Sequence, residues 1–161
     1  MGRKLLHISP LLVVLIVATI LRFYNWDDIP FWQDEFSALF RTGYSDFHTL
    51  IQEGVMVDYH PAGIQVFLNY WVALLGEDPA LVKLPFIIFG IASVYLIYAI
   101  GKAWFNPTSG ILAGAYLASL QFFILYSQTA RPYASGLFFG LLMVWCFTRW
   151  ILKPYGNQKW N

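Results

Sequence analysis

The residues that could perform chemistry lie in a few short clusters. Asp34 and Glu35 are adjacent carboxylates, a residue type that can accept a proton as a general base. His60 stands directly before a proline and could bind a phosphate or contribute to a metal site. Lys83 and Arg131 are cations, and the guanidinium fork of Arg131 suits phosphate because it donates two parallel hydrogen bonds. A carboxylate beside such cations suits a transfer reaction in which a phosphate leaves.

Each of these residues also has a structural interpretation. Asp34 and Glu35 are typical of the first turn of a helix, where the helix dipole stabilises carboxylates. His60 is equally a polar residue ahead of a proline that opens the next helix. Arg131 beside a turn is typical of a snorkelling arginine. The functional interpretation therefore requires that the clusters meet on one side of a single structure.

The composition indicates that an integral membrane protein carries these clusters. Of the 161 residues, 58% are hydrophobic and only 12% are charged, whereas a soluble domain has about 25% charged residues. The formal net charge of +1 gives no argument for nucleic acid as a partner, and membrane lipids are the expected surroundings. The single cysteine, Cys146, excludes an internal disulfide framework and a cysteine-based zinc site.

The uncharged runs predict an all-α fold, a polytopic membrane helix bundle with about four transmembrane helices in a single membrane domain over 1–161. About 20 apolar residues cross a bilayer as a helix. The predicted spans are 5–24, 84–101, 109–127 and 134–151. The apolar run 61–76 is marginal in length, and we interpret it as an interfacial or re-entrant helix, with a fifth span as the alternative.

The distribution of charge predicts which loops share a side. All nine acidic residues lie between Asp27 and Asp78, whereas the loops on the other side carry only basic residues. The positive-inside rule then places the N-terminus in the cytoplasm and the segment 25–83 outside a cell (inner) membrane, on its periplasmic side. A spanning 61–76 would turn the basic C-terminal tail outward, which disfavours that alternative. Interfacial helices are expected in this outer segment near Asp34 and over Asp46–Gln52.

The ordered set of clusters resembles the polyprenol-phosphate-sugar-dependent glycosyltransferases of the GT-C type. Within this type, the chain resembles bacterial members of the protein O-mannosyltransferase and lipid A aminoarabinose transferase superfamily. The resemblance is carried by Asp34-Glu35, by His60-Pro61 and by the run Tyr126-Ser127-Gln128-Thr129-Ala130-Arg131-Pro132-Tyr133. It is also carried by the stretch Gly76–Pro85, in which Lys83 stands where relatives usually have arginine. The chain departs from many relatives at Ala62, where they have proline, and at Thr129, where they have an acid.

The resemblance implies an enzyme, an inverting hexosyl- or pentosyltransferase of the cell envelope. Its donor would be a polyprenyl-phosphate sugar, and its acceptor a lipid, glycan or protein at the outer face of the membrane. Asp34 would be the catalytic base with Glu35 beside it. Binding of the donor phosphate would fall to His60, Lys83 or Arg131. The ring of Tyr133 could line the region that holds the polyprenol headgroup.

Three questions stay open at the level of the sequence. Asp34, Glu35 and His60 could hold a divalent cation, but their spacing is not diagnostic of any metal, and no other cofactor is predicted. Relatives have many more spans, so the chain is expected to be the N-terminal part of a larger GT-C module. The alternative to an enzyme is a non-catalytic membrane subunit or a transporter that binds a lipid phosphate and does not need Asp34.

Overall fold

The computed structural model describes residues 9–58 and 60–152. In these residues the chain forms eight α-helices and one π-helix, with no strand, which confirms the predicted all-α class. The elements are α1 (Pro10–Phe23), α2 (Gln33–Leu39), α3 (Phe47–Thr49), η1 (Leu50–Val55), α4 (Ala62–Leu75), α5 (Pro79–Trp104), α6 (Pro107–Ser119), α7 (Gln121–Ser127) and α8 (Pro132–Ile151).

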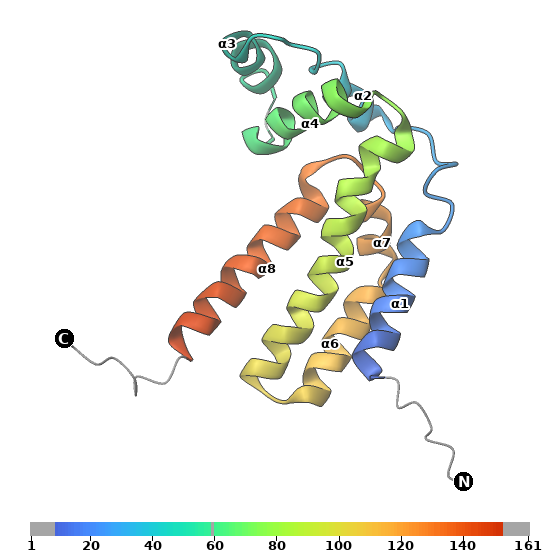
Figure 1. Cartoon of the computed structure of the whole chain (residues 1–161), viewed down its shortest axis with the longest axis vertical. Helices are drawn as coiled ribbons and strands as arrows, with labels where there is room; N and C mark the ends of the chain where they lie inside the picture. The colour runs from blue at the N-terminus through green and yellow to red at the C-terminus, as the bar shows by residue number, and fades with distance from the viewer. Residues whose placement is uncertain (1–8, 59, 153–161) are drawn as a thin grey trace, which may run out of the picture.

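The helices are arranged as a bundle with a crossing layer at one end (Figure 1). The bundle consists of α1, α5, α6, α7 and α8, with the long helix α5 in its middle. The short helices α2, α3, η1 and α4 come between α1 and α5 in the chain and lie across one end of the bundle. We call this end the outer end, because it holds the segment that was predicted to lie outside the membrane.

The bundle agrees with the predicted spans and refines them. Among the described residues, α5 with 26 residues and α8 with 20 are long and apolar enough to cross a membrane. The predicted span 109–127 is instead the pair α6 and α7, which are bent by 64° at Leu120 and count as a third candidate span. Helix α1 is a shorter apolar helix, and residues 5–8 of its predicted span lie outside the described residues.

Helix α4 takes the orientation expected of an interfacial helix. It has 14 apolar-rich residues, too few for a comfortable span, and it runs across the bundle rather than along it (Figure 1). Its side chains share one core with the bundle, because Leu68 and Val72 pack with Val82 and Phe86 of α5. The structure therefore favours the interfacial interpretation of 61–76 over a fifth span.

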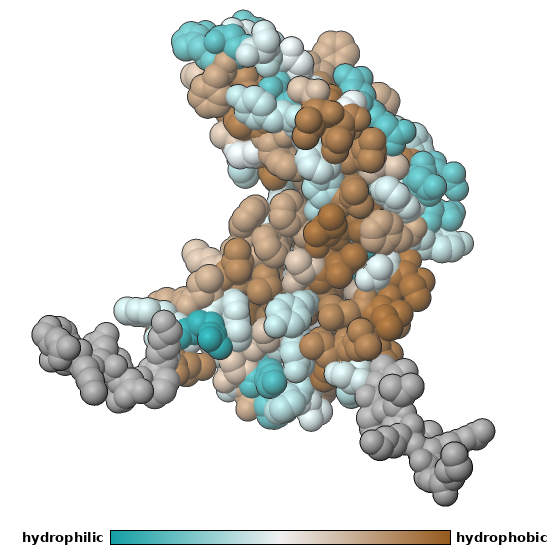
Figure 2. Space-filling view, viewed as in Figure 1, coloured by the Kyte–Doolittle hydropathy of each residue, from teal (hydrophilic) through white to brown (hydrophobic). Residues whose placement is uncertain are grey.

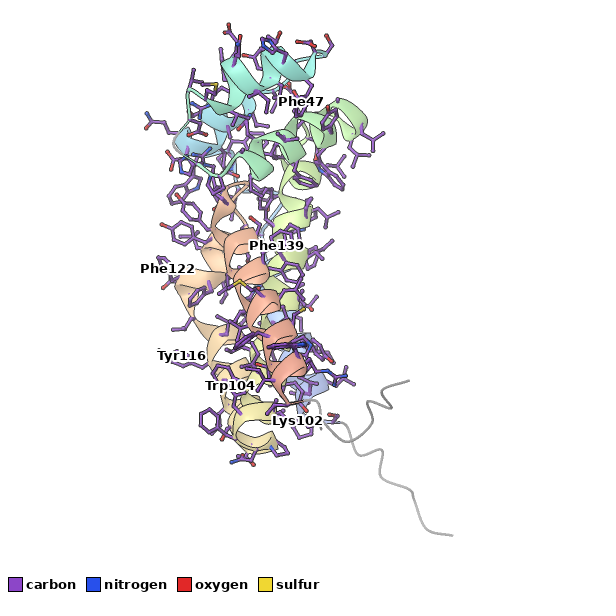
Figure 3. All side chains as sticks on the ribbon, turned by 90° about the vertical axis from the view of Figure 1, so that its left-hand side faces the viewer. Phe47, Lys102, Trp104, Tyr116, Phe122 and Phe139 are labelled. Atoms are coloured by element: carbon purple, nitrogen blue, oxygen red, sulfur yellow. The ribbon has the colours of Figure 1, made fainter. Side chains whose placement is uncertain are left out.

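The apolar and polar surfaces separate along the bundle. On the face drawn in Figure 2, hydrophobic residues cover the bundle, and hydrophilic ones gather on the outer helices and at the opposite end. Lys102 lies at that opposite end (Figure 3), far along α5 from the segment that holds the acids. The predicted separation of the acids from Lys102 is therefore confirmed, while the direction of the bundle in a membrane stays a prediction.

A proline inside α5 shows how the outer layer is attached. Pro85 has no backbone N–H, so the carbonyl of Leu81, four residues earlier, loses its partner within the helix. The indole nitrogen of Trp71 in α4 donates a hydrogen bond of 2.9 Å to that carbonyl. The carbonyl that Pro85 leaves without a helical partner thus holds α4 against α5.

The bend between α6 and α7 is stabilised from α1. The guanidinium of Arg22 donates hydrogen bonds of 3.2 Å to the carbonyls of Leu117 and Ala118, in the last turn of α6. These carbonyls form the negative end of the helix dipole, which suits a cation. Gly90 of α5 makes the space, since a Cβ there would lie 3.0 Å from Nε of Arg22. Arg22 is 1% exposed, so a buried arginine lies at the bend between α6 and α7.

Candidate active site

Three segments of the chain converge at the outer end of the bundle on one carboxylate, Asp58. Arg41 follows α2, Asp58 and His60 lie between η1 and α4, and Arg131 is the N-cap residue of α8. Oδ2 of Asp58 lies 3.0 Å from Nη2 of Arg41 and 3.6 Å from Nη1 of Arg131. Oδ1 lies 2.7 Å from Nδ1 of His60. We call these four residues the Asp58 cluster.

The cluster is held in a site with little solvent. The side chains of Asp58 and Arg131 are 8% and 4% exposed, whereas that of His60 is 36% exposed. Burial by itself raises the pKa of Asp58, but the hydrogen bond from His60 and the charges of Arg41 and Arg131 outweigh it and lower that pKa. The carboxylate is therefore ionised near neutral pH and accepts hydrogen bonds only.

Arg131 is a buried member of this cluster. Its Nη2 approaches the ring nitrogens of His60 at 2.7 and 3.0 Å, and its Nε is buried with no hydrogen-bond partner among the described residues. A snorkelling arginine would reach out to water, so the structure contradicts that interpretation of Arg131. Two guanidinium groups around one carboxylate leave the cluster with an excess of positive charge, which suits an anionic ligand.

Glu35 holds the start of α2 against the turn before α8. The Trp32 N–H donates to its Oε2 at 3.0 Å, and the Ala130 N–H donates to its Oε1 at 2.7 Å. Glu35 is 1% exposed. Both oxygens thus accept from backbone donors, an arrangement that favours a positioning role for Glu35.

Asp34 differs from its neighbour in its surroundings. It lies in the first turn of α2 and is exposed, with no hydrogen bond to another described residue. Because Glu35 is bonded to Ala130, the residue next to Arg131, Asp34 is carried to the same end of the bundle as the Asp58 cluster. Of the two predicted acids, Asp34 is the one whose carboxylate is available to a substrate.

Lys83 also lies at the outer end of the bundle, but its ammonium group binds backbone carbonyls of the protein. Its Nζ donates to the carbonyls of Ile29 and Pro30 at 2.7 and 3.3 Å, and it lies 5.5 Å from the centre of the Phe31 ring. The residue is fully buried. Its contacts join α5 to the loop that precedes α2, and this geometry favours a structural role over the predicted contact with a phosphate.

Tyr133 belongs to an aromatic group at the start of α8. Its ring lies 4.4 Å from that of Tyr126 in an edge-to-face arrangement, and Tyr126 lies equally close to Phe122. Tyr133 is 40% exposed and Phe122 62% exposed. Exposed aromatic side chains near the end of a bundle are typical of the headgroup region of a membrane. A contact of Tyr133 with the headgroup of a polyprenol donor stays a prediction.

An apolar cavity of about 340 Å³ adjoins the Asp58 cluster. It lies where α4 faces α8, on the side where the outline in Figure 2 is hollowed. Two of its lining residues, Pro61 and Pro132, directly follow His60 and Arg131 in the chain. Phe139, which Figure 3 labels on α8, lines it together with Phe89 of α5 and with Ile64 and Phe67 of α4. The walls of the cavity are thus apolar, and two of its lining residues are chain neighbours of His60 and Arg131.

Sequence reasoning missed two members of the cluster and the arginine of α1. Asp58 was visible only as a carboxylate two residues before His60, and Arg41 as a basic residue in an acidic segment. Arg22 was hidden at the end of a predicted span. Among the described residues, no group of three or more His, Cys, Asp or Glu side chains is placed to hold a metal ion.

Comparison with known proteins identifies the family. No curated protein and no solved structure matches the chain. A family model described as dolichyl-phosphate-mannose-protein mannosyltransferase matches residues 59–160, which hold His60, Lys83, Arg131 and the helices from α4 to α8. Asp34 and Glu35 precede the matched region. Since the match covers more than half of the chain, the protein belongs to the dolichyl-phosphate-mannose-protein mannosyltransferase family, whose members are membrane glycosyltransferases of the GT-C type.

Proposed function

We propose that the protein transfers a sugar from a polyprenyl-phosphate donor to a lipid, glycan or protein acceptor at the outer face of the cell membrane. One observation carries the proposal: at the outer end of the bundle, the residues that directly follow His60 and Arg131 of the positively charged Asp58 cluster, Pro61 and Pro132, line an apolar cavity. A ligand with an anionic head and an apolar tail matches both parts. Polyprenyl phosphates have this form, and membership of the family supports them as donors.

In this proposal Arg131 stabilises the departing phosphate. The bond between the anomeric carbon and the phosphate oxygen breaks, and the negative charge on the polyprenyl phosphate grows as the sugar leaves. A guanidinium held in a site with little solvent stabilises that charge more strongly than it would in water. Arg41 already pairs with Asp58 at 3.0 Å, so a donor phosphate can compete for Arg131 without leaving Asp58 unpaired.

Asp34 acts as the base in the same step. The acceptor hydroxyl attacks the anomeric carbon from the side opposite the phosphate, and its proton passes to the Asp34 carboxylate. This geometry inverts the anomeric centre, as the family resemblance implies. Glu35 has both oxygens bonded to backbone N–H groups, so it positions α2 and leaves the proton transfer to Asp34.

A transfer assay tests the proposed function. Membranes that contain the full-length protein are incubated with a panel of polyprenyl-phosphate sugars, including dolichyl phosphate mannose, and with a membrane extract as the source of acceptors. We expect incorporation of one labelled sugar and release of polyprenyl phosphate. Tight binding of the donors without any transfer would instead support the non-catalytic subunit or transporter.

The proposed function also predicts the side of the membrane on which two positions of the chain lie. In a Cys146→Ser background, a cysteine at Thr42 is expected to react with a membrane-impermeant thiol reagent added to intact cells. A cysteine at Asn157 is expected to react only after the cells are opened. Labelling of both positions from the outside would contradict the four-span topology, and a Thr42 cysteine that reacts only after the cells are opened would place the Asp58 cluster on a side that the donor does not reach.

A further inference from the structure

The contact between Asp58 and His60 determines which ring nitrogen carries a proton. Nδ1 of His60 lies 2.7 Å from Oδ1 of Asp58, and the Asp58 carboxylate is an acceptor only. The hydrogen of this bond must therefore belong to Nδ1. In a neutral imidazole the proton on one nitrogen leaves the other nitrogen as an acceptor, so the hydrogen bond of Asp58 makes Nε2 the acceptor.

Arg131 does not occupy that acceptor in the plane of the ring. A single atom, Nη2, lies 2.7 Å from Nδ1 and 3.0 Å from Nε2. The in-plane lone-pair directions of the two nitrogens point away from each other, so one atom that close to both must lie over the face of the ring. A guanidinium over a neutral ring is attractive, whereas a protonated ring would repel it. The position of Arg131 over the ring thus fits the tautomer with its proton on Nδ1.

The Nε2 lone pair is consequently available at the site. No in-plane partner for it is found among the described residues, and the His60 side chain is 36% exposed. The next residue in the chain, Pro61, lines the apolar cavity. A lone pair repels a phosphate oxygen but accepts a hydrogen bond from a hydroxyl.

We propose that Asp58 holds His60 in the tautomer with its proton on Nδ1, so that Nε2 binds a hydroxyl group of a substrate and not the donor phosphate. The hydroxyl belongs either to the sugar of the donor or to the acceptor. This inference rests on the proposed function, and it changes the role expected for His60 from phosphate binding to hydroxyl recognition. Asp58 becomes a positioning residue that acts through His60.

The tautomer is tested first by ¹⁵N NMR of histidine-labelled protein in lipid nanodiscs, with His60→Gln to assign the signal. We expect a protonated Nδ1 and an unprotonated Nε2 at neutral pH. Asp58→Ala should shift the ring toward the form with its proton on Nε2, while Arg41→Lys should keep the original tautomer. A protonated Nε2 in the unsubstituted protein overturns the proposal, whether or not Asp58→Ala folds.

The ligand is tested by measuring binding of dolichyl phosphate and of dolichyl phosphate mannose to the same nanodiscs. His60→Ala should leave the affinity for dolichyl phosphate unchanged. If Nε2 binds the sugar, the variant should bind the mannosylated donor about tenfold more weakly, the loss expected for one hydrogen bond. If Nε2 binds the acceptor, donor affinity is retained and the KM for the acceptor rises instead. His60→Gln should restore part of either loss, because its amide oxygen can accept.

The results separate this inference from the proposed function. Equal weakening of both lipids by His60→Ala shows phosphate binding and overturns the inference, while the proposed function stands. Unchanged donor affinity together with an unchanged acceptor KM also overturns it. If the unsubstituted protein neither binds these lipids nor transfers sugar, the proposed function fails and hydroxyl recognition fails with it, whereas the NMR result on the tautomer is independent.

Discussion

Asp34→Asn is expected to lower the rate of sugar transfer by about 10²–10⁴-fold, the usual contribution of a general base. Asparagine keeps the size of the side chain but cannot take the proton of the acceptor hydroxyl. Because Asp34 is exposed and makes no hydrogen bond to another described residue, the change should leave the fold and the affinity for the donor as they are. The measurement is the single-turnover rate with the donor selected by the transfer assay, alongside donor affinity.

Two neighbouring acids serve as controls for this prediction. Asp28 is an exposed acid of the same outer segment, and Asp28→Asn should transfer sugar at the normal rate. Glu35→Gln should instead lower thermal stability, because its amide nitrogen would face one of the two backbone N–H groups that the carboxylate now binds. Near-normal turnover by Asp34→Asn, or an equal loss in Asp28→Asn, would show that Asp34 is not the base.

The helices of the bundle could be predicted from the sequence because long apolar runs carry few charges. The predicted spans 84–101 and 134–151 lie within α5 and α8. Asp46, where a short outer helix was expected to begin, accepts a hydrogen bond from the Thr49 N–H at 2.8 Å. The bend at Leu120 could not be predicted, since no proline or glycine stands there. Its stabilising contact comes from Arg22, 95 residues earlier than Leu117, and only the tertiary structure brings the two together.

The site could be predicted as a set of residues but not as a set of roles. Glu35 and Lys83 have the types that a transferase site needs, and both lie at the outer end of the bundle. Their polar atoms, however, bind backbone groups of the protein, and the sequence cannot show whether a charged group already has partners within the fold. For the same reason Asp58 was overlooked: its importance comes from Arg41 and Arg131, which approach it from two other segments.

Arg131→Ala is expected to lower the rate of transfer by about 10²–10³-fold, the loss typical of removing a preorganised group that stabilises a developing negative charge. It should also weaken binding of the donor and of dolichyl phosphate, because both carry the phosphate. Arg131→Lys keeps the charge but not the planar fork, so it should recover only part of the loss. A membrane anchor would behave differently, since lysine would then replace arginine without cost and donor affinity would not change.

The burial of Arg131 raises a competing explanation, in which it serves only to pair Asp58. Arg41 separates the two explanations, because it contacts the same Oδ2 at 3.0 Å while Arg131 lies at 3.6 Å. If pairing of Asp58 is what matters, Arg41→Ala should damage dolichyl phosphate binding at least as much as Arg131→Ala. If Arg131 binds the phosphate, Arg41→Ala should lower thermal stability yet retain most of the affinity. Equal losses of affinity in the two variants would therefore assign Arg131 to the fold and leave the donor phosphate without its proposed partner.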